Sequence, residues 1–194
     1  MKNPLLDYSD QPFGTIPFKE LKKDHFVPAI KSGIRESESS IEKITQNADL
    51  PTFENTVLSL ELSDGNLETS LTAYYHLFGS ESDKDFKNLS DQISPMFAEF
   101  QNNVYLNKSL FKRIEAVYKN RKSLNLNEDK RLLDVTYKDF IRNGAALNDE
   151  DKDKLRKIDK ELSTLSPQFS KNALNATNEI ELWLEKDDLD GLPK

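Results

Sequence analysis

Residues 26–44 read FVPAIKSGIRESESSIEKI, and the spacing of their apolar side chains decides the fold class of the chain. The apolar and small positions recur every three or four residues, which is the repeat of one face of an α-helix. This stripe consists of Phe26, Ile30, Ile34, Ser37, Ile41 and Ile44. A helix with one apolar face must bury that face against another element, so the stretch predicts a helical bundle.

The same repeat continues along the chain and predicts helices over 52–78, 82–104, 110–118, 127–141 and 148–176. Thr52, Asn127 and Asn148 are suitable N-caps, Asp64-Gly65 is expected to break the second helix, and Gly144 is expected to close the fifth. In the last helix the repeat is heptad-like, which is compatible with a free coiled coil. A helix in an antiparallel bundle is the more ordinary explanation of such a repeat, and we favour it. That repeat consists of Leu155, Ile158, Leu162, Leu165, Phe169, Asn172 and Ala176.

The two ends of the chain have a different character. Residues 1–24 contain several prolines, which favour an extended backbone, and enough apolar side chains to hold an arm on the helices. Residues 180–185 alternate apolar and charged side chains, which predicts a single β-strand whose pairing partner lies outside this chain. We therefore expect an all-α bundle divided into an extended arm (1–24), a helical domain (25–178), and a strand and turn (179–194).

Composition excludes several classes of function. The net charge of −7 argues against a nucleic-acid or anionic-membrane partner, since both need a positive surface. The chain has no cysteine, so it has neither disulfides nor thiolate metal sites. A cytoplasmic origin is expected, or a periplasmic one if a leader was removed. The apolar fraction is only 36%, which indicates either long, wet amphipathic helices or a piece whose buried partner half is missing.

Residues able to perform chemistry are scarce. There are two histidines, His25 and His76, and no His-Glu-x-x-His pattern that would hold zinc on a helix. A capping role is favoured for the first histidine and packing or a local hydrogen bond for the second. The acidic clusters 149–151 and 187–188 lack the EF-hand pattern, and the first of them favours a helix N-terminus. No catalytic, cofactor-binding or metal-binding residue is predicted in this chain.

A further group of side chains is aromatic: Tyr74, Tyr75, Phe78, Phe97, Phe100 and Tyr105. Such a group is compatible with a peptide-binding surface. At helical spacing it is more typical of a hydrophobic core.

Several ordered blocks together resemble one family. The blocks include Asn3-Pro4-Leu5-Leu6, His25-Phe26-Val27-Pro28-Ala29, Pro51-Thr52-Phe53-Glu54-Asn55-Thr56, Leu106-Asn107-Lys108-Ser109-Leu110-Phe111, Gly144-Ala145-Ala146-Leu147 and Leu189-Asp190-Gly191-Leu192-Pro193. Their order and spacing resemble the N-terminal region of the thimet-oligopeptidase-type zinc metallopeptidases. Within that family the blocks are most similar to bacterial peptidyl-dipeptidases (dipeptidyl carboxypeptidases), with bacterial oligopeptidase A as a near relative.

The resemblance implies a nearly all-helical enzyme whose two halves enclose a deep channel, with zinc bound by a His-Glu-x-x-His helix and a further glutamate. None of these ligands maps onto residues 1–194, so the zinc is expected in the parent protein and not in this part. The resemblance therefore implies a non-catalytic wall of the channel opposite the zinc. Its expected partners are the C-terminal catalytic domain of the same polypeptide and short peptide substrates.

Two other interpretations stay open from the sequence. The chain is alternatively a standalone helical interaction module that gathers partners along the Leu155–Phe169 stripe. A weaker alternative is an independent hydrolase that uses His25 or His76.

Overall fold

A computed structural model describes residues 3–8, 10–80, 83–181, 183, 185, 188, 190 and 191. Within these residues the regular structure is helical, which confirms the all-α prediction. The α-helices are α1 (Lys23–Gln46), α2 (Ser59–Glu61), α3 (Gly65–Ser80), α4 (Lys84–Asn88), α5 (Ser90–Tyr105), α6 (Lys108–Lys119), α7 (Asn127–Arg142) and α8 (Asp149–Asn178). A π-helical turn, η3 (Phe53–Leu58), precedes α2, and short 3₁₀ turns lie at Pro12–Gly14, Phe18–Glu20 and Arg121–Ser123.

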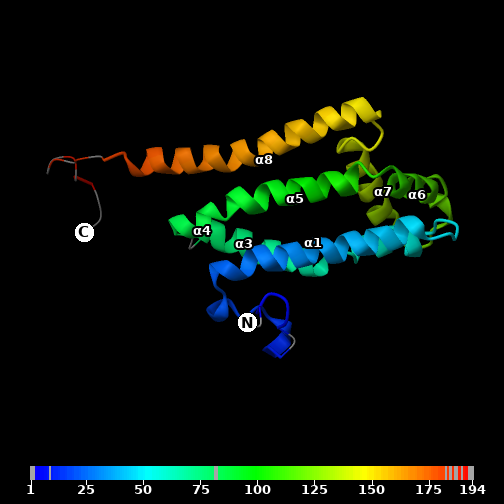
Figure 1. Ribbon diagram of the computed structural model, residues 1–194, viewed down its shortest axis with the longest axis horizontal. Coiled ribbons are helices and arrows are strands. Elements are labelled where there is room, and N and C mark those ends of the chain that lie inside the picture. The colour runs from blue at the N-terminus through cyan, green and yellow to red at the C-terminus, as the bar shows by residue number, and fades with distance from the viewer. Residues whose placement is uncertain are drawn as a thin grey trace.

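The long helices stack in layers (Figure 1). α1 packs along α3, α8 packs along α5, and α5 lies between α8 and the α1–α3 pair. α1 and α3 run in opposite directions, as do α5 and α8, while α6 and α7 pack together at the end of the bundle where α1 finishes. The C-terminal end of α8 extends past the other helices (Figure 1).

Gly33 sets the close approach of α1 and α3. A Cβ atom at this position would lie 2.7 Å from the Cα atom of Leu67 in α3. The missing side chain therefore lets the two helix backbones approach directly. The predicted stripe of α1 is buried beside this contact, from Phe26 to Ile44.

The Pro51–Thr56 block forms the entrance to the second helical segment. Thr52 is its N-cap: the side-chain oxygen accepts from the backbone N–H of Asn55 at 3.2 Å, and the Asn55 side chain accepts from the N–H of Thr52 at 2.9 Å. Phe53 and Val57 then pack in a small core with Val117 of α6. The predicted break at Asp64-Gly65 is present, because α2 ends at Glu61 and α3 begins at Gly65.

The caps of the last two helices follow the sequence with one shift. Asn148 caps α8 by accepting from the N–H of Asp151 at 2.9 Å, and Gly144 after α7 has the positive φ of 88° expected of a closing glycine. The predicted cap Asn127 is instead the first residue of α7, and Leu126 takes the cap position without a side-chain hydrogen bond. The N-cap of α7 therefore lies one residue earlier than predicted.

The N-terminal arm is held by its first residues. Leu5 is fully buried in the main core, and the side chain of Asn3 donates to the backbone oxygen of His25 at 2.8 Å. Ile16 and Leu21 pack partly on the same core, whereas Phe13 is fully exposed. The division of the chain into arm, helical domain and C-terminal segment stays a prediction.

The prediction of a β-strand over residues 180–185 is wrong for the described residues. Ile180, Glu181, Trp183 and Glu185 lie in neither a helix nor a strand, and residues 182 and 184 lie outside the described part. The alternating pattern is present in the sequence, but a strand needs a second strand to pair its N–H and C=O groups. None of the described segments supplies one, and Trp183 is 86% exposed.

Candidate functional site

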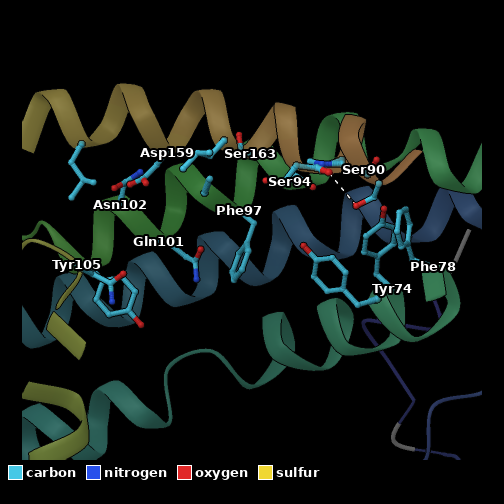
Figure 2. A pocket seen from close by; sticks show the side chains of 18 of the residues that line it. Tyr74, Phe78, Ser90, Ser94, Phe97, Gln101, Asn102, Tyr105, Asp159 and Ser163 are labelled. Atoms are coloured by element: carbon cyan, nitrogen blue, oxygen red, sulfur yellow. Dashed lines mark hydrogen bonds between the residues drawn. The ribbon is translucent and has the colours of Figure 1, made fainter. Parts of the chain in front are cut away.

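A groove of about 550 Å³ lies between α3 and α8, with α5 as its floor. We call it the α3–α8 groove. Its floor carries hydroxyl, amide and aromatic side chains of α5, including Ser94, Phe97 and Gln101. Asp159 and Ser163 of α8 and Tyr74 and Phe78 of α3 form its walls (Figure 2).

Polar contacts fix one edge of α8 on α5. Arg156 donates to the side chain of Asn103 at 3.0 Å, and Lys171 forms an ion pair with Asp91 at 2.8 Å. These contacts lie at both ends of the helix pair. They hold α8 in a defined orientation over the groove.

The apolar stripe of α8 lies on the other side of that helix and is largely uncovered. Leu155 and Leu162 line the groove, while Ile158, Leu165 and Phe169 continue the stripe at spacings of three and four residues. In α8, all of which is described, Lys152 is the one buried side chain. The predicted bundle helix is therefore seated mainly on α5, and most of its apolar stripe is exposed.

The opposite wall contains a buried phenol. The side chain of Tyr74 is fully buried, contacts Tyr75 edge-on at 5.1 Å between ring centroids, and stacks on Phe86 at 5.4 Å. Its hydroxyl has no hydrogen-bond partner among the described residues. Burial raises the pKa of Tyr74 and, in the same way, that of Tyr75, so both phenols stay neutral hydrogen-bond donors.

The aromatic group singled out from the sequence is thus divided between two roles. Tyr74 and Phe100 are buried, as expected of a core, whereas Tyr75 is half-exposed at the groove. Sequence spacing alone did not separate the core residues from the groove residues. That distinction depends on which faces of the neighbouring helices α8 leaves uncovered.

The two histidines have separate structural roles. The Nδ1 atom of His25 accepts a hydrogen bond from the backbone N–H of Lys22 at 3.1 Å, which caps the start of α1. His76 is exposed on α3 and contacts the ring of Phe18 edge-on, with 6.1 Å between centroids. The capping and packing roles predicted for them are confirmed.

The acidic cluster 149–151 is tied to the start of α8. Asp149 pairs with Lys108 of α6, and Lys154 contacts both Glu150 and Asp151, at 2.8 and 3.1 Å. The second predicted cluster includes residue 187, which lies outside the described part. Among the described residues there is no group of three or more His, Asp or Glu side chains that could hold a metal ion. The residues present therefore do not fit a zinc site.

Lys152 is a buried cation, and the helix end that it contacts accounts for its burial. Its ammonium group donates to the backbone oxygen of Leu106 at 3.3 Å, and Leu106 is the C-cap of α5. A cation is favourable at a helix C-terminus. Burial, and then the neighbouring Lys108, lower the pKa of Lys152. No local sequence pattern predicts this contact, because it depends on how α8 is seated on α5.

A second hollow lies between α2, α5 and α7 and has an acidic rim. Its volume is about 400 Å³, and its lining includes Glu61, Asp64, Glu68 and Asp139. Burial raises the pKa of Asp64, and the nearby Glu68 carboxylate raises it further. This second hollow has no feature that points to a particular ligand.

Taking the described residues alone, each helix is too short or too polar to cross a bilayer.

The chain is similar in sequence to several known peptidases. It is 35% identical over 176 residues to a dipeptidyl carboxypeptidase of Salmonella typhimurium, a match that covers 90% of this chain and 26% of that protein. It is 28% identical over 193 residues to an organellar oligopeptidase A of Arabidopsis thaliana, covering 98% of this chain and 24% of the relative. The oligopeptidase A of Haemophilus influenzae is 26% identical over 196 residues, covering all of this chain and 28% of the relative. No family model matches the chain.

These matches confirm the resemblance predicted from the sequence blocks: the chain is a relative of the thimet-oligopeptidase-type peptidases. Within them its relatives include the dipeptidyl carboxypeptidases and the oligopeptidases A. The chain spans about a quarter of the length of the curated relatives that it matches.

Proposed function

We propose that this chain is the N-terminal, non-catalytic helical part of a zinc metallopeptidase. The parent enzyme removes C-terminal dipeptides from short peptides or cleaves such peptides internally. One observation carries the proposal: the match to a dipeptidyl carboxypeptidase covers 90% of this chain but only 26% of that protein. The parent enzyme is proposed to act in the cytoplasm.

The side chains of the chain support a non-catalytic role. A catalytic zinc site takes three protein ligands and leaves one position for water. His25 and His76 are occupied in a helix cap and a ring contact, and neither lies in a group of potential ligands among the described residues. The zinc and the residues that bind it are therefore proposed to come from the catalytic domain outside residues 1–194.

The mechanical role proposed for the helices is that of a rigid wall. In the full-length enzyme it would form the half of a channel opposite the zinc and admit short peptides while excluding folded proteins. The antiparallel packing of α1 on α3 and α8 on α5 supports such a role, because packed helices hold a fixed shape better than loops. Its partner would be the catalytic domain of the same polypeptide.

The gene and two purified proteins test this function. We expect a His-Glu-x-x-His sequence downstream of Lys194. The full-length protein should contain one zinc ion per chain by mass spectrometry of metals and hydrolyse short peptides. Chain 1–194 should do neither. One tightly bound zinc ion in chain 1–194, or peptide hydrolysis by it, would contradict the proposal.

A second candidate function is a standalone helical interaction module. The exposed stripe of α8 favours it, since Ile158, Leu162 and Phe169 are each at least half exposed. A stop codon directly after Lys194 would support this alternative. So would a concentration-dependent dimer that Leu162→Asp dissociates.

A further inference from the structure

We propose that the α3–α8 groove, together with the exposed apolar stripe of α8 beside it, is the docking seat of the catalytic part, and that an amphipathic helix with an uncharged contact face occupies it. This inference rests on the proposed function, because the occupant belongs to the part of the polypeptide outside residues 1–194. Beyond the proposed function, the inference specifies the surface that makes the contact and the chemistry of the segment that binds there.

The first observation is the exposure of the α8 stripe. Leu162 is 51% exposed, Ile158 53%, Leu165 55% and Phe169 75%. Single exposed apolar residues are common, but a continuous row beside a groove marks an interaction surface. A charged solvent-facing helix would not keep four large apolar side chains at helical spacing.

The second observation is the surface area of the whole chain. It exposes 13,481 Å². A compact monomer of 22.3 kDa exposes roughly 9,400 Å² by the usual scaling of surface with mass. Obligate interfaces bury about 2,000–5,000 Å², so the excess is large enough for a permanent partner. The protruding end of α8 contributes to this excess (Figure 1).

The charge of the groove selects the chemistry of the occupant. Among the lining residues, Asp159 and Arg142 are the only charged side chains, and the remainder are aliphatic, aromatic, hydroxyl or amide groups. A free peptide end would need a cluster of one charge sign to hold its ammonium or carboxylate group. The groove lacks such a cluster, so it favours a neutral, partly apolar surface over a peptide terminus.

The length and floor of the groove fit a helix. From Leu155 to Phe169 the stripe covers four turns, or about 21 Å at 1.5 Å per residue. A helix of about 15 residues matches that span. The serines of the floor offer hydrogen bonds to polar side chains at the edge of its apolar face.

The extent of the relatives identifies the source of this helix. About three quarters of their length lies outside the match, which is ample polypeptide to supply a helix. A second copy of this chain would instead place its own α8 against this one. That arrangement is an outcome of the test below.

The test compares the full-length protein with chain 1–194, each carrying Leu162→Asp and Phe169→Asp together. In chain 1–194 these side chains are exposed, so helix content by circular dichroism and the Tm should change little. In the full-length protein the Tm should fall by several degrees, and amide exchange across 155–170 should become about tenfold faster or more. Leu162→Met with Phe169→Leu should restore the original behaviour.

Leu126→Asp is the matched control, because Leu126 is 60% exposed and does not line the groove. It should be neutral in both proteins. Equal tolerance of the double Asp variant in both proteins, with groove amides exchanging equally fast, would overturn the docking proposal. A dimer of chain 1–194 that the variant dissociates, with the full-length protein unaffected, would assign the groove to a second copy and also overturn it.

Binding of a short peptide provides a third outcome. If a peptide protects groove amides of the full-length protein, and the variant weakens that binding without lowering the Tm, the groove is a substrate site and the proposal is wrong. A gene that encodes no peptidase after Lys194 would instead overturn the proposed function itself. An active peptidase with an uncovered groove would overturn only the docking inference.

Discussion

The guanidinium group of Arg113 in α6 donates a hydrogen bond of 3.1 Å to the side-chain oxygen of Asn55, 58 residues earlier in the chain. The same guanidinium donates to the backbone oxygens of Asn47 and Asp49, at 2.8 and 3.2 Å. Asn55 in turn donates to the backbone oxygen of Leu50 at 3.0 Å. The Pro51–Thr56 block thus has a structural role: it shapes the connection after α1 and ties it to α6.

Arg113→Ala should therefore destabilise the fold. Hydrogen bonds to charged groups contribute about 1.5–3 kcal/mol, and the loop carbonyls would lose their partner, so we expect a loss of about 2 kcal/mol. Chemical denaturation of chain 1–194 measures it. Lys112→Ala, at the exposed neighbouring position, is the control and should change stability by less than about 0.5 kcal/mol. Equal stability of the two variants would refute the role given to Arg113.

Gly33→Ala should also destabilise the chain, because the added Cβ would collide with the backbone of Leu67 and push α1 away from α3. Overpacking of this kind costs about 1–3 kcal/mol. Gly79→Ala in α3 is the matched control, since its Cβ meets no atom within 4 Å and alanine is the better helix former. It should stabilise by about 0.5–1 kcal/mol. Thermal unfolding should give the two variants opposite signs.

Asp64→Asn should stabilise the chain at neutral pH. Burial, assisted by Glu68, raises the folded-state pKa of Asp64 above 3.8. The protonated form is therefore favoured by folding, and stability falls as the pH rises from below 3.8 through the raised folded pKa. The difference between variant and parent should be near zero at the acidic end of this range, grow through it and level off at neutral pH. If the stability advantage of Asp64→Asn shrinks as the pH rises, the folded-state pKa of Asp64 is lowered and the prediction is wrong.

Asn148→Ala should loosen α8 locally. The loss of an N-cap costs about 1 kcal/mol, and amide exchange at the start of α8 should accelerate. Asn127→Ala tests the same substitution at the first residue of α7, where the helix has no side-chain cap. We expect no comparable acceleration there.

The helical periodicity predicted most of this architecture. The stripe from Phe26 to Ile44, the Thr52 and Asn148 caps and the closing Gly144 are local signals, and the structure contains each of them. The strand at 180–185 was wrong for the described residues, because periodicity reports which faces a segment offers and not whether a partner exists. The α3–α8 groove was not predicted either. It depends on how far α8 is covered, which no local pattern encodes.

The sparse support of α8 has a consequence for how the chain matures during translation. A helix that buries one side chain and packs mainly on α5 should open far more readily than α1 or α3, whose apolar faces are enclosed. As the last described helix of this chain, it emerges from the ribosome after α5. We expect α8 to be the part of chain 1–194 that is most open to chaperones and proteases. In the longer enzyme proposed above, polypeptide synthesised later would shield α8, and its accessibility would then distinguish unfinished molecules from completed ones.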